Sequence, residues 1–256
     1  ACTVVWEGSG RKARPYPDSA SQMTAHSLPP LSPELAKRIR LVRRDVGDLL
    51  FHFTRGLEPR WVEIQGCRLN MGETASHVLD KILSSGELRG SRQWTYGIDT
   101  VCFTEAPIHE FNSVFSLASI AADESQRPRY EPYGVAVPKH WLYQQGGRPV
   151  IYDHPGAIED YPVALRHRFC PYDPQNAIDF TWEREWRVAT SVLKLDPKNA
   201  LVIVPTSAEA FEFVYGYASE EADVDSDGSA SGVFHQPRWL AVSLDMFGLH
   251  YAPGDA

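Results

Sequence analysis

Residues 179–188 read DFTWEREWRV, a run that sets two carboxylates, Glu183 and Glu185, two positions apart at the start of an expected strand. Side chains of an extended chain alternate between two faces, so both carboxylates are expected on one face. Trp186 and Val188 then point the other way, toward a core. Two negative charges held this close repel each other, so they must either be solvated by water or serve a function in a site.

The segment alone leaves two interpretations open. In the first it is a charged strand edge whose acids pair with Arg184 and Arg187, because charged edges protect sheets from unwanted pairing. In the second, Glu183 and Glu185 serve chemistry in a site. The order of the elements around them favours the second interpretation.

Composition limits the class of protein. A chain of 256 residues with 43% hydrophobic residues is long enough for one substantial core. A net charge of -8 argues against indiscriminate nucleic-acid binding, which needs basic surface. No apolar run approaches the length of a membrane span, and no signal peptide is recognisable, so a soluble cytoplasmic protein with no membrane partner is predicted. The scattered cysteines, without a CxxC pair, fit a reducing compartment: Cys2, Cys67, Cys102 and Cys170.

The chain divides by composition into an arm and a domain. Residues 1–32 are rich in Pro, Ser and Gly and predict an extended N-terminal arm, whereas residues 33–256 predict a single α+β domain. An acidic Gly/Ser segment at 219–232 predicts a mobile loop. Helices are expected at 33–46 with Ser32 as N-cap, at 75–83 ending at Gly86, and at 208–214. Strands are expected at 49–54, 100–104, 133–137, 149–152, 185–190, 201–204 and 239–244.

Three elements carry candidate site residues. The run LLFHFT at 49–54 puts His52 and Thr54 on one face of the first strand. A later strand ends in the aromatic and polar residues Phe103 and Thr104. The third element is the Glu-x-Glu pair of residues 183–185.

The order of these elements resembles the start of an ADP-ribosyltransferase fold of the DarT-like kind. There an H-x-T strand (here 50–54) leads to a helix ending in a glycine-leucine turn (78–88), then to a strand closing in an aromatic residue (101–104). The Glu-x-Glu at 183–185 is similar to the third motif of that superfamily. The resemblance implies an ADP-ribosyltransferase-like split β-sheet core with flanking helices.

A second resemblance covers roughly residues 50–190. Three stretches recur together in AbiGi-type abortive-infection proteins: VCFTEAP at 101–107, YG to PVIY within 133–152, and EREWR at 183–187. This resemblance implies a role in antiphage defence or toxin–antitoxin biology. A toxin or antitoxin protein is then an expected partner.

The resemblance to ADP-ribosyltransferases implies that NAD is the substrate. Cleavage of its ribose–nicotinamide bond develops positive charge on the ribose, which a carboxylate beside the sugar stabilises. Glu185 is the candidate for that role, and it would also accept a hydrogen bond from the ribose hydroxyl. Glu183 would face a macromolecular acceptor of unidentified class and take its proton.

The same resemblance suggests residues that hold NAD. His52 and Thr54 would contact the adenosine-side ribose through directional polar contacts. Phe103 or Tyr96 would stack on the nicotinamide ring. The position of the second motif stays open among Tyr96, Phe103 and Thr104.

Other interpretations also stay open. The chain could be a non-catalytic antitoxin or sensor that keeps the fold without turnover. His52 could be a satisfied core histidine, and Cys102 with His52 could form a nucleophile pair, although a thiol in the run VCF is typical of a buried core. No histidine pair has zinc-site spacing, so no metal site is predicted. A metal-dependent nuclease would need four acids to converge: Asp99, Glu105, Glu183 and Glu185.

Overall fold

The structure is a computed structural model, and it falls into two units, residues 1–42 and 43–256. In the first unit α1 (Pro33–Val42) begins where Leu35 N donates to Ser32 Oγ at 3.2 Å, which confirms Ser32 as the N-cap. Residues 1–31, nearly all of the expected arm, lie outside the described ranges. The described residues are 32–42, 47–56, 61–64, 67–70, 72–120, 129–216, 222–224, 230–232 and 239–250.

The second unit alternates short strands with helices. Its α-helices are α2 (Ala75–Ser85), α3 (Phe111–Ile120), α4 (Lys139–Gln144) and α5 (Ser207–Gly216). Its strands are β1 (Leu49–Phe53), β2 (Trp61–Ile64), β3 (Cys67–Asn70), β4 (Glu87–Arg89), β5 (Thr100–Thr104), β6 (Gly134–Pro138), β7 (Arg148–Pro149), β8 (Ile151–Asp153), β9 (Phe169–Pro171), β10 (Glu185–Ala189), β11 (Val192–Lys194), β12 (Leu201–Val204), β13 (Ala222–Val224), β14 (Ala230–Gly232) and β15 (Leu240–Ser243). Short 3-10 helices are η1 (Ile108–Glu110), η2 (Pro155–Asp160), η3 (Val163–Arg168), η4 (Pro174–Asn176), η5 (Thr181–Glu183) and η6 (Asp245–Phe247).

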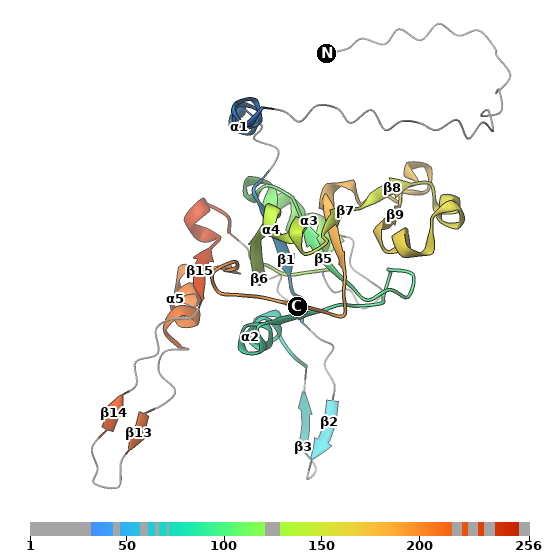
Figure 1. The fold of residues 1–256 in the computed structure, drawn as a ribbon. Coiled ribbons are helices and arrows are strands. Elements are labelled where there is room, and N and C mark those ends of the chain that lie inside the picture. Colours follow the sequence, from blue (N-terminus) through green and yellow to red (C-terminus); the bar gives the residue numbers. More distant parts are fainter. Residues whose placement is uncertain are drawn as a thin grey trace, which may run out of the picture. The chain divides into compact units, whose positions relative to one another are not determined.

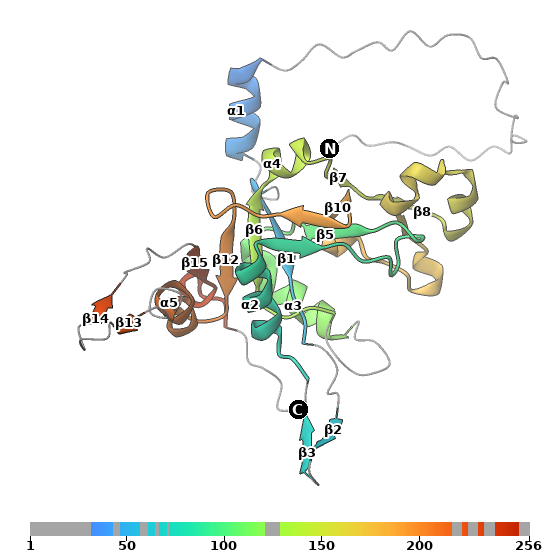
Figure 2. The same ribbon diagram turned by 60° about the horizontal axis from the view of Figure 1, so that its bottom comes forward.

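Seven strands form the central sheet, in the order β15-β12-β6-β1-β5-β10-β7 (Figure 1). All neighbours pair antiparallel except β12 with β15, which run parallel. Figure 2 shows β10 beside β5 and β12 beside β6 from a second direction. This mixed, mostly antiparallel architecture agrees with the predicted α+β class.

Alternation along the strands builds a core on each face of the sheet. On β1, Leu50 belongs to a cluster with Leu79 of α2, whereas its neighbour Phe51 belongs to a cluster with Phe111 of α3. Trp186 of β10 joins the α2 cluster, as the strand pattern predicts. Helices α2 and α3 therefore cover opposite faces.

The elements predicted most closely are those with strong local signals. Strands β5 and β12 have the predicted bounds, and α2 ends at Gly86, whose φ of 66° is left-handed. Helix α3 was missed, because Pro107, which precedes the turn η1 leading into it, supplies no side-chain cap. The expected loop at 219–232 contains the paired strands β13 and β14, and its other residues lie outside the described ranges.

No helix within the described residues is long and apolar enough to cross a membrane.

The packing of α2 on the sheet makes a stability prediction. Leu79 is fully buried, so Leu79→Ala should leave a cavity and cost about 2–5 kcal/mol of unfolding free energy in urea denaturation. The control is Val163→Ala on η3, where 69% of the residue is exposed and the change should stay within about 0.5 kcal/mol. Equal losses in the two variants would contradict the packing described here.

Candidate functional site

The central sheet is interrupted between β1 and β5. The two strands share one register pair, Phe51 with Thr104. A regular antiparallel ladder would continue with His52 opposite Phe103 and Phe53 opposite Cys102, but the Cys102 carbonyl instead accepts a hydrogen bond of 2.7 Å from Nδ1 of His52. The imidazole therefore spans the space in which the two backbones would otherwise pair.

The tautomer of His52 follows from this bond. A carbonyl oxygen only accepts, so Nδ1 carries the proton, and in the neutral ring Nε2 is left as an acceptor. Burial lowers the pKa of His52, and the bond to the Cys102 carbonyl offsets part of that change. His52 is thus a neutral hydrogen-bonding group at physiological pH.

A cavity of about 210 Å³ opens at the interruption. It is lined by the ends of β1 and β5, the turn at 93–95, residues 129–130, and the acids before and on β10. Its lining includes five of the seven predicted site residues: His52, Phe103, Thr104, Glu183 and Glu185. Cavities for drug-sized ligands are about 300–1,000 Å³, so this one suits a single ring or part of a larger ligand.

Glu183 reaches the cavity from a turn, not from a strand. It is the last residue of η5, and Arg184 after it is left-handed with φ 44° and ψ 51°, so β10 begins only at Glu185. The expectation that the two acids share a face through strand alternation is therefore wrong. Both line the cavity because the left-handed residue turns the chain between them.

The Glu183 carboxyl is buried, and few polar contacts replace the water that it loses. Only 8% of the residue is exposed, and Oε1 makes no hydrogen bond with the described residues. Nε of Arg129 lies 3.3 Å from that oxygen, an ion-pair distance without hydrogen-bond geometry. Burial raises the pKa of Glu183 to about 7, against the lowering effect of Arg129. The carboxyl can therefore bind or release a proton near neutral pH.

Glu185 has a different environment. Its two carboxylate oxygens accept hydrogen bonds of 2.8 Å each from Nε and Nη2 of Arg187, two residues along the same strand. Nη1 of Arg187 donates to the carbonyls of His167 and Phe169, at 2.8 and 2.9 Å. Burial by itself lowers the pKa of Arg187, but Glu185 raises it above its ordinary value. The expected ion pair with Arg187 therefore exists. It is formed by Glu185, and it is buried and not at an exposed strand edge.

Tyr130 brings a second polar atom without a partner to the cavity. Its hydroxyl is buried and makes no hydrogen bond with the described residues. The ring stacks near Phe53, with centroids 5.8 Å apart, and lies 6.4 Å from that of Trp182. Burial, followed by the charge of Glu183, raises the pKa of Tyr130, so the hydroxyl stays protonated. Arg129 and Tyr130 belong to no motif in the sequence, which is why the sequence analysis missed them.

Thr104 lines the cavity, but its hydroxyl serves the backbone. Oγ1 donates to the carbonyl of Glu183 and accepts from the amide of Ala106 at 3.1 Å. Its hydrogen bonds therefore hold the turn that carries Glu183.

Thr54 and Tyr96 do not line the cavity. The buried hydroxyl of Thr54 lies 2.9 Å from the carbonyls of Ala75 and Tyr133, which ties the end of β1 to α2 and β6. Tyr96 is 48% exposed and packs edge-on against Phe169, with centroids 5.8 Å apart.

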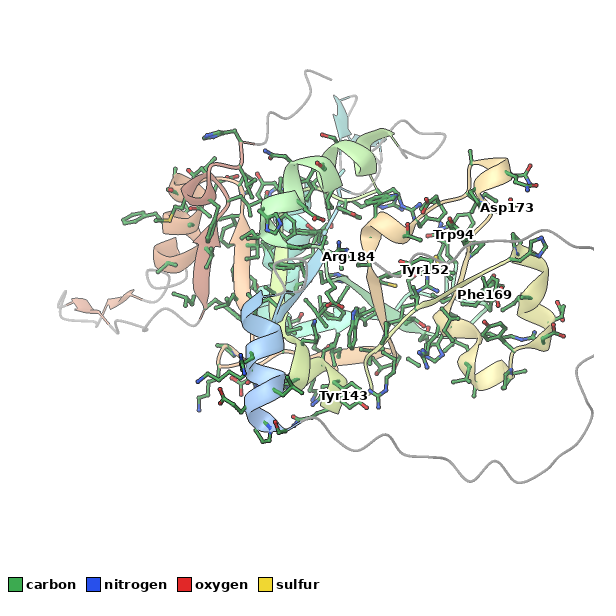
Figure 3. The ribbon with its side chains drawn as sticks, turned by 90° about the horizontal axis from the view of Figure 1, so that it is seen from above. Trp94, Tyr143, Tyr152, Phe169, Asp173 and Arg184 are labelled. Atoms are coloured by element: carbon green, nitrogen blue, oxygen red, sulfur yellow. The ribbon has the colours of Figure 1, made fainter. Side chains whose placement is uncertain are left out.

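Trp94 stands at the rim of the cavity on a strained turn. It is 80% exposed with φ 64°, a left-handed conformation that costs a residue other than glycine about 1–3 kcal/mol. The hydroxyl of the buried Thr95 anchors the turn, since it lies 2.7 Å from the carbonyl of Ile98 and 3.0 Å from that of Ser91. Figure 3 shows Trp94 in the same part of that view as Tyr152 and Phe169.

The geometry bears on the Cys–His alternative. Nδ1 of His52 bonds to the backbone carbonyl of Cys102, so this nitrogen is not free to take a proton from the thiol. Burial raises the pKa of the Cys102 thiol well above its ordinary value, and the charge of Glu185 adds to this. A thiolate nucleophile at Cys102 is thus disfavoured.

The four acids of the nuclease alternative have separate partners. Asp99 is bound by Arg92, with Nε 2.9 Å from Oδ1. Glu105 accepts from Lys139 and from the indole of Trp186, which lies on the opposite face of β10 from Glu185. Across the part of the chain that the structure describes, no group of three or more His, Cys, Asp or Glu side chains could hold a metal ion.

Comparisons of the chain with protein-family models, with curated proteins and with solved structures give no match.

The Glu185–Arg187 pair predicts a large effect when one partner is removed. Arg187→Met should cost about 3–5 kcal/mol in urea denaturation, because it leaves Glu185 buried without its partner. The double variant Arg187→Met/Glu185→Met should recover much of that loss. Arg92→Met is the control, since the Arg92–Asp99 pair is exposed and should matter little. Additive losses in the double variant would show that the two side chains do not depend on each other.

The raised pKa of Glu183 predicts a pH-dependent stability. The unfolded chain loses this proton near pH 4.5 and the folded chain near 7, so the contribution of Glu183 to stability falls as pH rises between these values. Glu183→Gln has no such proton, and its stability relative to wild type should grow by about 3 kcal/mol across that range. Parallel curves of unfolding free energy against pH would contradict this, and the exposed Glu212→Gln serves as control.

Proposed function

We propose that this protein is an ADP-ribosyltransferase that uses NAD, or an NAD hydrolase built on the same site, acting in antiphage defence or a toxin–antitoxin system. The observation that carries the proposal is that His52, Phe103, Glu183 and Glu185, named from separate motifs, line one cavity. These residues come from three segments far apart in the sequence: β1, β5, and the turn that leads into β10.

The proposed reaction breaks the bond between ribose and nicotinamide. The electron pair of that bond leaves with nicotinamide, and the positive charge that develops on the ribose is stabilised by the two carboxyl side chains. The acceptor, or water, then bonds to the ribose carbon and gives its proton to Glu183. Glu183 suits this role because its pKa is about 7, whereas Arg187 fixes the orientation of Glu185.

The size of the cavity limits how NAD would bind. About 210 Å³ accommodates the nicotinamide ring with part of its ribose, so the adenosine half would lie outside. Phe103 lines the cavity, but it is 2% exposed and lies opposite Trp186 in the core on the α2 face, so its ring points away from Glu185 and is not assigned to nicotinamide. His52 offers Nε2 as a hydrogen-bond acceptor. Trp94, at the rim and 80% exposed, could contact the remainder of NAD or the acceptor.

A second candidate function is a non-catalytic antitoxin or sensor. The observation that favours it is the Glu185–Arg187 pair, because a guanidinium bound to both oxygens reduces the charge available to stabilise a cationic sugar. Such a protein would bind a partner or a ligand without turnover.

The experiment that tests the enzyme incubates the purified protein with labelled NAD and with protein, DNA and RNA acceptors. Nicotinamide release is followed by chromatography, and label transfer by gel. Glu183→Gln should lower the rate at least about 100-fold, the effect typical of removing a general base. The rate should rise with pH through about 7, since Glu183 must lose its proton before it can accept another.

The control is Glu212→Gln on α5, an exposed acid outside the cavity, which should keep wild-type rates. The proposed enzyme activity would be overturned if the wild-type protein released no nicotinamide and labelled no acceptor, so that it did not differ from Glu183→Gln. A tightly co-purifying protein partner, with an unchanged phenotype in cells carrying Glu183→Ala, would support the non-catalytic alternative.

A further inference from the structure

One hydroxyl group joins the two ends of the turn that carries Glu183. Tyr152 lies half-buried on β8, and its hydroxyl is 3.2 Å from the carbonyl of Phe180 and 3.3 Å from the amide of Glu185. A carbonyl only accepts and an amide N–H only donates, so the hydroxyl donates to Phe180 and accepts from Glu185. Phe180 precedes η5 and Glu185 begins β10, which leaves Glu183 between the two contacts.

This turn needs support from outside. Arg184 within it has φ 44°, a conformation that persists only where surrounding contacts enforce it. Inside the turn the amide of Glu183 donates to Phe180 at 3.0 Å, and Thr104 donates to the Glu183 carbonyl from the neighbouring strand. Among the described residues, Tyr152 makes hydrogen bonds to both ends of the turn through its hydroxyl.

The hydroxyl keeps its proton under physiological conditions. Burial raises the pKa of Tyr152, and the hydrogen bond from the Glu185 amide offsets only part of that rise. The two contacts therefore persist across the pH range in which Glu183 titrates.

We propose that Tyr152 is a positioning residue whose hydroxyl holds the 180–185 turn so that the Glu183 carboxyl stays in the cavity and out of water. Without the hydroxyl, the turn relaxes around Arg184 and Glu183 gains solvent. An effect of Tyr152 on catalysis rests on the proposed function. The effect of Tyr152 on the position of the Glu183 carboxyl can be tested whether or not the protein is an enzyme.

Several charged and titratable groups face Glu183, and Tyr152→Phe removes one of them, the Tyr152 hydroxyl. The others are the guanidinium groups of Arg129 and Arg187, the carboxylate of Glu185, the hydroxyl of Tyr130 and the thiols of Cys102 and Cys170. Because burial is the largest cause of the raised pKa of Glu183, a change in titration reports a change in the exposure of the carboxyl.

Infrared difference titration tests the proposal through the carbonyl stretch of protonated Glu183, assigned as the band that Glu183→Gln lacks. In Tyr152→Phe, which keeps the ring, the acid dissociation constant of Glu183 should rise about tenfold or more, toward that of an exposed glutamate. Tyr161→Phe is the matched control. It removes a hydroxyl of the same segment, which donates to Asp153 at 3.0 Å and does not contact the turn.

Thermal unfolding shows that each variant is folded at the temperature of the titration. A Glu183 titration that is the same in wild type, Tyr152→Phe and Tyr161→Phe would overturn the proposal, even if Tyr152→Phe melts at a lower temperature. A second readout is nicotinamide release: Tyr152→Phe should lower kcat about tenfold and move the pH profile to lower pH. If the wild type releases no nicotinamide, the proposed function fails, and the titration alone still decides the role of Tyr152.

Discussion

The buried pair of Glu185 and Arg187 is the interaction on which the site depends. Arg187 uses its guanidinium for two bonds to Glu185 and for two backbone carbonyls, those of His167 and Phe169. It therefore connects β10 in the central sheet to the chain around β9, which contributes no strand to that sheet. Because a buried charge without a partner costs several kcal/mol, neither side chain can change independently of the other.

The segment 148–183 supports both acids in different ways. Through the carbonyls of its 167–169 stretch it fixes Arg187 and thereby the orientation of Glu185. Through the hydroxyl of Tyr152 it holds the turn of Glu183. Two carboxyls two positions apart thus acquire different chemistry, since one is paired with a guanidinium and the other is buried with an oxygen that lacks a hydrogen bond. Separation of roles between two carboxyls by their environments is common in enzyme sites.

Parts of the fold could be predicted from local patterns. Strands β5 and β12 are short runs rich in apolar and β-branched residues, and α2 has apolar residues at helical spacing and ends at a left-handed glycine. The pair Glu183 and Glu185 was also found from sequence. The turn between them was not, because a left-handed Arg184 has no signal in its residue type and is imposed by tertiary contacts.

Other parts of the site were beyond sequence reasoning for the same reason. Tyr130 and Arg129 reach the cavity only through the packing of the fold, and no spacing relates them to the acids. Thr54 looked like a ligand-binding residue because it shares a strand pattern with His52. Its hydroxyl instead lies at hydrogen-bond distance from the backbone carbonyls of Ala75 and Tyr133, and the sequence pattern does not indicate these tertiary contacts.

The bond from His52 to the Cys102 carbonyl has a consequence for how the cavity is made. Where β1 and β5 stop pairing, the imidazole of His52 bonds to the Cys102 carbonyl, so the cavity begins at a local defect in the sheet and is completed by the turn at 93–95, residues 129–130 and the turn that carries Glu183. The wall of the cavity on the side of β1 and β5 belongs to the sheet itself, and a single hydrogen bond from His52 joins the two strands there. Exchanging that one residue would therefore alter how this side of the cavity is closed.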